Sequence, residues 1–132
     1  GAAKYGADLR MDGMLYGKLL RSEHHHARIL SIDVSEAVSM KGVSAVVTAD
    51  DIPGTTYLPN CQPQVYVFPK DRIRFKGEAL AGVAAISEKI ASEALKKIKV
   101  KVEVLPHAIE IKDAVKSSAT PLYNHSPRVS KV

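Results

Sequence analysis

Residues 79–104 carry three successive patterns of apolar and polar positions, each typical of a different element. Residues 79–86 (ALAGVAAI) contain no charge, which favours a strand covered on both faces. Residues 88–98 follow helical spacing, with an apolar stripe of Ile90, Ala91, Ala94, Leu95 and Ile98. Residues 99–104 (KVKVEV) alternate strictly, so their three valines share one face of a strand. The pattern predicts a strand–helix–strand unit, with Ser87 as the helix N-cap.

The first half of the chain predicts a second unit of the same kind. Apolar runs at residues 14–20 and 27–32 favour two strands, which are close enough to pair as a hairpin and would equally fit one bent ribbon. Residues 35–40 form a short helix, which must be held by packing of Val34, Ala37, Val38 and Met40. Residues 43–48 (VSAVVT) add a β-branched strand. We therefore expect an α+β fold, with two strand–helix–strand halves around a mixed sheet.

The remaining segments are less regular. Prolines are spread through residues 54–71, which predicts a long surface loop of the kind that is more often functional or interface-making than idle. A short strand is expected at residues 73–75 and a last helix at residues 112–116. Residues 117–132 form an expected extended tail that needs a surface to lie on. We predict a single domain over residues 1–132.

Composition limits the class of protein. The chain has 132 residues, 45% of them hydrophobic, which suits one domain with one core. No apolar run approaches the roughly 20 residues of a membrane-spanning helix, and the start lacks a signal peptide pattern. A single cysteine, Cys61, excludes an internal disulfide and favours a reducing compartment, for which we predict the cytoplasm. Because the chain starts at Gly1 rather than Met, we expect a cut end of a longer protein.

The charge of the chain is uneven. Its formal net charge is +5, with −1 on residues 1–66 and +6 on residues 67–132. A basic half is compatible with a free-standing binding module for an acidic protein or nucleic acid, which we keep as the alternative function. However, several lysines fall on the outward positions of the predicted helix and strand, and aromatic residues make up only 5% of the chain. We therefore predict no nucleic-acid partner and no membrane partner.

The segment before the second strand contains the residue types of two kinds of site. His24, His25 and His26 suggest a metal, but in an extended chain at most two of them reach one ion, and no carboxylate or cysteine at ligand spacing completes the shell. Ser22, a neighbouring histidine and Asp33 are the residue types of a nucleophilic triad, but no Gly-X-Ser-X-Gly turn surrounds the serine. We favour polar turn residues over either site.

Three further features are candidates for chemistry. Glu78 enters a buried strand, where a carboxylate either acquires a raised pKa suited to acid–base work or, more often, accepts backbone donors. Cys61 has no basic neighbour that would activate a thiolate. Gly42, Gly77 and Gly82 do not have a phosphate-binding spacing. The sequence therefore predicts no catalytic, cofactor-binding or metal residue in this chain.

An ordered series of short motifs resembles the opening of a known protein family. The series includes Gly13-Met14-Leu15-Tyr16, Leu20-Arg21-Ser22, His26-Ala27-Arg28-Ile29, residues 48–54 (TADDIPG), residues 73–81 (IRFKGEALA) and residues 102–106 (VEVLP). It is similar to the start of the large, molybdenum-binding subunit of molybdenum hydroxylases, which include xanthine dehydrogenase, aldehyde oxidase and carbon monoxide dehydrogenase. The resemblance departs from the usual pattern at Glu23, His25 and Glu78, where Pro, a small residue and Gln are frequent.

The resemblance implies that this chain is an α/β hammerhead domain, and it also implies what this domain does in the parent enzyme. In that family, molybdopterin and the base glutamate belong to later domains, and iron–sulfur clusters and FAD belong to other domains or subunits. The resemblance therefore implies a non-catalytic domain, whose partners are the remaining domains of the molybdenum-binding subunit and the iron–sulfur and flavin subunits. The parent enzyme, of xanthine dehydrogenase type, would hydroxylate a heteroaromatic or aldehyde carbon with oxygen from water.

Overall fold

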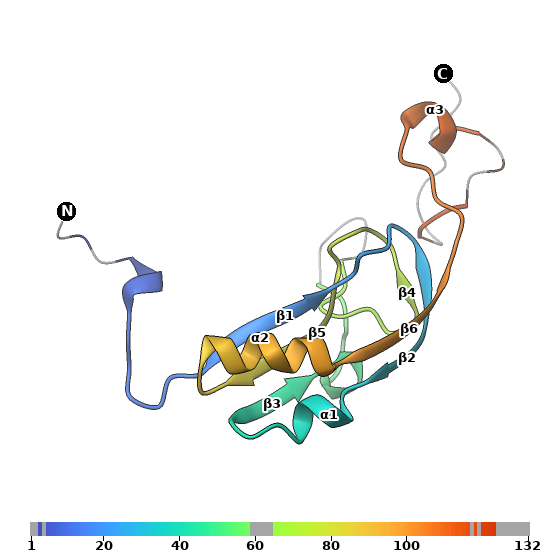
Figure 1. Cartoon of the computed structure of the whole chain (residues 1–132). Helices are drawn as coiled ribbons and strands as arrows, with labels where there is room; N and C mark the ends of the chain where they lie inside the picture. The colour runs from blue at the N-terminus through green and yellow to red at the C-terminus, as the bar shows by residue number, and fades with distance from the viewer. Residues whose placement is uncertain (1–2, 4, 59–64, 117, 119, 124–132) are drawn as a thin grey trace.

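Six strands form two three-stranded sheets, and consecutive strands alternate between them. The computed structural model describes residues 3, 5–58, 65–116, 118 and 120–123. The strands are β1 (Tyr16–Arg21), β2 (Ala27–Asp33), β3 (Val43–Val47), β4 (Arg72–Ile73), β5 (Ala79–Ala85) and β6 (Lys99–Val104). One sheet has the order β1-β5-β3 and the other β4-β2-β6, and all these pairings are antiparallel (Figure 1).

The helical segments are mostly short. They are η1 (Gly6–Asp8), α1 (Ser35–Val38), η2 (Ala49–Asp51), α2 (Glu88–Lys97) and α3 (Ile111–Ala114). The N-cap predicted for α2 is confirmed, because Ser87 Oγ accepts a hydrogen bond from the backbone N–H of Ile90 at 3.2 Å. The predicted helices and strands are therefore all present, with ends that shift by one or a few residues.

The α+β class is confirmed, but the predicted mixed sheet is wrong. The expected mixed sheet is replaced by two antiparallel sheets. The runs that become β1 and β2 do not pair as a hairpin, because β1 pairs with β5 while β2 pairs with β4 and β6. They are successive strands joined through residues 22–26, as in the bent ribbon. Both strand–helix–strand units exist, and each passes from one sheet to the other.

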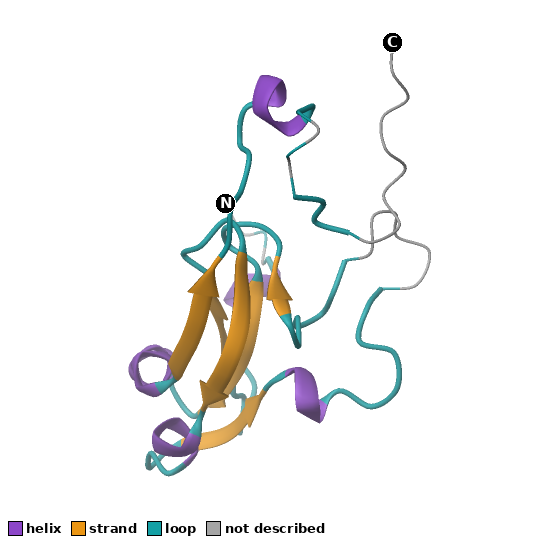
Figure 2. Cartoon of the chain, turned by 90° about the vertical axis from the view of Figure 1, so that its right-hand side faces the viewer, coloured by secondary structure: helices purple, strands orange, loops and turns teal. Residues whose placement is uncertain are grey.

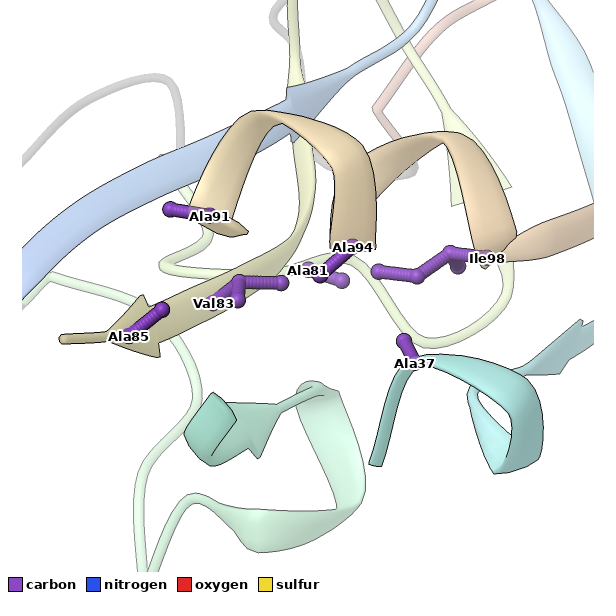
Figure 3. Close-up of a cluster of buried hydrophobic side chains, with 7 residues drawn as sticks. All are labelled: Ala37, Ala81, Val83, Ala85, Ala91, Ala94 and Ile98. Carbon is purple, nitrogen blue, oxygen red and sulfur yellow. The ribbon is translucent and has the colours of Figure 1, made fainter. Parts of the chain in front are cut away.

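The main core lies between α2, α1 and the first sheet. Its buried members come from α1, α2, β5 and the residue that follows α2, and they are Ala37, Ala81, Val83, Ala85, Ala91, Ala94 and Ile98 (Figure 3). Ala91 and Ala94 have no exposed surface and face β5, so the helix lies close to the strand. A smaller core of Ala27, Ile73 and Leu80 lies between the sheets.

The packing of α1 differs from prediction at one residue. Ala37 is fully buried, and Val34 and Met40 pack against the main core as expected. Val38 is 56% exposed, so its predicted packing role is wrong. The helix ends after a single turn, and this turn can bury only a narrow stripe, which Ala37 occupies.

The segments around the proline-rich loop are more ordered than predicted. Tyr57 and Tyr66 form an isolated antiparallel bridge, and the N–H of Val67 donates to the carbonyl of Thr56 at 2.9 Å. Phe68 and Pro69 are buried. Residues 59–64, including Cys61, and most of the predicted tail at residues 117–132 lie outside the described residues.

We expect Ala94→Leu to lower the free energy of unfolding by about 1–3 kcal/mol, because three extra carbons must fit between α2 and β5. The matched control is Glu93→Leu on the same helix, whose side chain is half exposed, and which should change stability by no more than about 0.5 kcal/mol. Urea denaturation of both variants measures the difference. Equal effects would mean that the contact tolerates larger side chains.

Candidate functional site

Four polar or charged side chains are buried around two adjacent turns. They are Ser22, His26, Arg74 and Glu78, which we call the polar cluster. The first two lie between β1 and β2, and the last two lie between β4 and β5. The two turns are joined because Ser22 N donates to Glu78 O at 2.9 Å and Gly77 N donates to Ser22 O at 2.8 Å. The polar cluster therefore lies where the chain twice crosses between the sheets.

Glu78 lies inside the turn that precedes β5. It is 3% exposed, and its Oε2 accepts a hydrogen bond from the backbone N–H of Arg74 at 2.6 Å. Burial raises the pKa of Glu78 above its usual value, and the backbone N–H and the charge of Arg74 offset part of that rise. Both properties expected from the sequence, a raised pKa and a backbone donor, are therefore present on one carboxylate.

Arg74 links this turn to two aromatic rings. Its Nη1 donates to the carbonyl of Arg72 at 2.8 Å. Its guanidinium carbon lies 4.4 Å from the ring centroid of Tyr66 and 5.6 Å from that of Tyr123. These distances are suited to cation–π contact, which stabilises a cation withdrawn from water. Arg74 thus connects this turn to Tyr66 and to Tyr123, two residues far apart along the chain.

The aromatic side of this cluster was missed from the sequence. Burial raises the pKa of Tyr123, and the nearby charge of Glu78 adds to the rise. Arg74 and Glu78, four residues apart around Gly77, gave a local signal of a shared turn. Tyr66 and Tyr123 gave none, because both lie in irregular segments whose paths are set by tertiary contacts.

The three histidines are held in different ways. His26 is fully buried, and its Nδ1 lies 2.7 Å from the carbonyl oxygen of Pro106, so Nδ1 carries the proton and donates it. The ring of His25 stacks on His107, with centroids 5.2 Å apart. Among the residues that the structure describes, no group of three His, Cys, Asp or Glu side chains is placed to hold a metal ion.

Ser22 and Asp33 do not form a triad. The hydroxyl of Ser22 donates to the carbonyl of His24 at 3.0 Å and accepts from the N–H of His24. Asp33 Oδ1 instead accepts from the N–H and the hydroxyl of Ser35 at the start of α1. Ser22 thus closes a local turn, and Asp33 holds the entry to a helix.

Two of the glycines have structural surroundings that explain them. Gly77 has a positive φ of 91°, as the turn into β5 requires. A Cβ added at Gly82 would lie 3.1 Å from Val47 and 3.4 Å from Leu19, so close packing of neighbouring strands accounts for this position. Both glycines therefore serve the fold at the entry to β5 and along it.

A cleft of about 200 Å³ opens between the two sheets beside the polar cluster. It is lined by Leu20, Ile73, Leu80, Ile98, Val100 and Val102, with residues 21–24 around it. The lining combines six aliphatic residues with polar and charged ones, and it does not include Glu78 or Arg74. The carboxylate with the raised pKa therefore does not face the cleft.

The fold and these turns define a known class of domain. The model of the aldehyde oxidase and xanthine dehydrogenase a/b hammerhead domain matches residues 1–106. The chain belongs to this family, and the hammerhead fold expected from the resemblance is confirmed.

Curated relatives and solved structures agree with this assignment. The chain is 42% identical over 121 residues to a Bacillus subtilis protein described as a probable xanthine dehydrogenase subunit, covering 92% of this chain and 16% of that protein. It is 35% identical to the carbon monoxide dehydrogenase large chain of Afipia carboxidovorans, covering 83% of this chain and 14% of that one.

The aldehyde oxidoreductase from Desulfovibrio desulfuricans superposes with a TM-score of 0.84 at 30% identity, over 95% of this chain and 15% of that chain. The chain therefore spans a small part of the relatives that it matches. Among the described residues, no helix is long and apolar enough to cross a membrane.

We expect Glu78→Gln to change the pH dependence of stability. Because the folded pKa is raised, ionisation of Glu78 costs stability as pH rises from about the unfolded value of 4.5 through the folded pKa. The unfolding free energy of the variant, relative to the natural chain, should therefore rise across that window and then level off. The control is Glu103→Gln, an exposed carboxylate on β6. A flat difference for Glu78→Gln across the window would contradict the buried geometry.

We expect Arg74→Lys to lower the unfolding free energy by about 1–3 kcal/mol, since lysine keeps the charge but loses the planar guanidinium and its paired donors. Hydrogen exchange at residues 65–68 should also become faster. Arg72→Lys is the matched control, because Arg72 contributes its backbone carbonyl to this contact. Equal losses in the two variants would show that the guanidinium contacts contribute nothing specific.

Proposed function

We propose that this chain is the non-catalytic N-terminal domain of the molybdenum-binding subunit of a molybdenum hydroxylase, of xanthine dehydrogenase type. The observation that carries the proposal is the 42% identity over 121 residues to the Bacillus subtilis protein, of which those residues make up 16%. The described chemistry supports it, because the polar cluster is occupied in joining two turns. The domain acts as a folded scaffold that packs against the rest of the subunit.

The parent enzyme, on this proposal, hydroxylates a heteroaromatic or aldehyde carbon with oxygen from water. Molybdopterin would be held by later domains, and iron–sulfur clusters and FAD by partner domains or subunits. The described residues of this chain do not fit the metal itself, since they contain no suitable group of three ligands. We assign no step of the reaction to them.

The domain boundaries and the compartment are part of the same proposal. On this proposal residues 1–132 belong to one domain, in which the expected proline-rich segment at residues 54–71 and the expected tail at residues 117–132 lie partly outside the described residues. The single cysteine supports a reducing compartment, the cytoplasm.

The alternative of a free-standing module for acidic partners is not favoured. Several basic side chains of the second half pair with acidic ones of the same chain. Lys99 and Lys97, for example, both contact Glu36 of α1. These exposed pairs place acidic side chains among the basic ones, as on the mixed-charge surface of an ordinary folded domain.

Metal analysis and activity assays of two proteins test the proposed function. The full-length subunit, expressed with its partner subunits, should contain stoichiometric molybdenum and pterin and oxidise a purine or an aldehyde. The 132-residue chain should fold, contain no molybdenum and oxidise neither substrate. Stoichiometric molybdenum with turnover in the 132-residue chain, or neither in the full-length assembly, would overturn the proposal.

A further inference from the structure

Two segments project from opposite ends of the folded body. The N-terminal arm comprises residues 5–15 and includes η1, and the C-terminal arm comprises residues 105–116 and includes α3 (Figure 1). Helix α3, at the top of Figure 2, stands clear of both sheets. The two arms are therefore separate from the cores described above.

The N-terminal arm carries large apolar side chains that the domain does not cover. Tyr5 is 74% exposed, Leu9 59% and Met11 77%. Its backbone hydrogen bonds are local, such as Asp8 N to Tyr5 O at 2.9 Å and Met14 N to Met11 O at 3.1 Å. These bonds shape the arm without burying its apolar side chains.

The C-terminal arm has the same character. It is fixed at its base, where Leu105 N donates to His26 O at 3.0 Å and His107 stacks on His25. Beyond this base, Ile109, Ile111 and Val115 are 67%, 83% and 68% exposed. The backbone hydrogen bonds of described residues in this part stay within α3 and its ends.

The local hydrogen bonds of each arm are too few to stabilise its conformation without tertiary packing. A helix of four residues is too short to be stable in water without tertiary packing. Large apolar side chains gathered on a projecting segment also mark a surface that another body covers. Lys116, just after α3, is paired with Asp113 at 2.5 Å, so Lys112 and the apolar Ile111 and Val115 make up most of the exposed surface of this part.

We propose that the two arms bind one occupant, an apolar surface of the later domains of the same subunit. This inference rests on the proposed function, and it identifies the surface through which the scaffold acts. The relatives supply the reason for choosing this occupant, since the Desulfovibrio desulfuricans structure superposes on 95% of this chain, and the match takes up only 15% of that longer chain. That coverage includes both arms at least in part, in a protein where further chain is present.

Hydrogen exchange compares the 132-residue chain with the full-length subunit. In the 132-residue chain, amides of residues 5–11 and 107–115 should exchange at nearly the rate of an open chain. In the full-length subunit, the same amides should exchange at least about tenfold more slowly. Equal rates in the two proteins would overturn the proposal, and so would protection of the shorter chain that grows with its concentration, which would indicate a second copy.

A double variant separates docking from folding. Ile111→Ser with Val115→Ser should leave the thermal midpoint of the 132-residue chain unchanged, because both side chains are exposed there. In the full-length subunit, it should remove most of the protection of residues 107–115. The matched control, Lys112→Ser with Ala114→Ser on the same helix, should retain that protection, and equal loss in both would overturn the apolar contact.

Molybdenum content, measured on the same samples, distinguishes this proposal from the proposed function. A molybdenum-loaded subunit with unprotected arms would overturn the docking alone. A subunit with protected arms and no molybdenum would overturn the proposed function and retain the docking.

Discussion

Helix α2 packs on β5 through a core that is rich in alanine, and the rest of the domain is positioned by this contact. Ala91 and Ala94 on the helix meet Ala81 and Ala85 on the strand, so the two backbones approach closely. The other face of β5 is equally tight, since Gly82 lies against side chains of both neighbouring strands. A strand with small residues on both faces is suited to the centre of its sheet, and β5 lies there between β1 and β3.

The placement of the second sheet follows from the first. Only Ile98 separates α2 from β6, and this buried residue belongs to the same core. The helix therefore places β6 away from β5, in the sheet that contains β2. The same alternation governs the whole chain, because odd-numbered strands form one sheet and even-numbered strands form the other. Every connection must cross between sheets, and turns at those crossings need hydrogen-bond partners inside the protein.

Sequence periodicity predicted the elements well because it reports which side of a segment is covered. The apolar run of β5, the stripe of α2 and the alternation of β6 all appear within a residue or two of their expected ends. Periodicity does not report which strands are neighbours, so it left the hairpin and the bent ribbon open for β1 and β2, and the predicted mixed sheet was wrong. The hammerhead fold was predicted from the family resemblance, because a known family fold specifies which strands pair and local patterns do not. For the polar cluster, Glu78 was identified from sequence, while the contact of Arg74 with Tyr123 joins residues far apart along the chain.

The polar cluster also shows how a fold can raise the pKa of a carboxylate. Glu78 is buried and faces the backbone N–H of Arg74 at the interior of a turn. The nearby cleft is lined mainly by aliphatic residues and lacks this carboxylate. Burying Glu78 has an electrostatic cost, and the compensating bonds fix the turn that sends the chain from one sheet into the centre of the other. The buried carboxylate of Glu78 is therefore part of the turn through which the chain crosses from one sheet to the other.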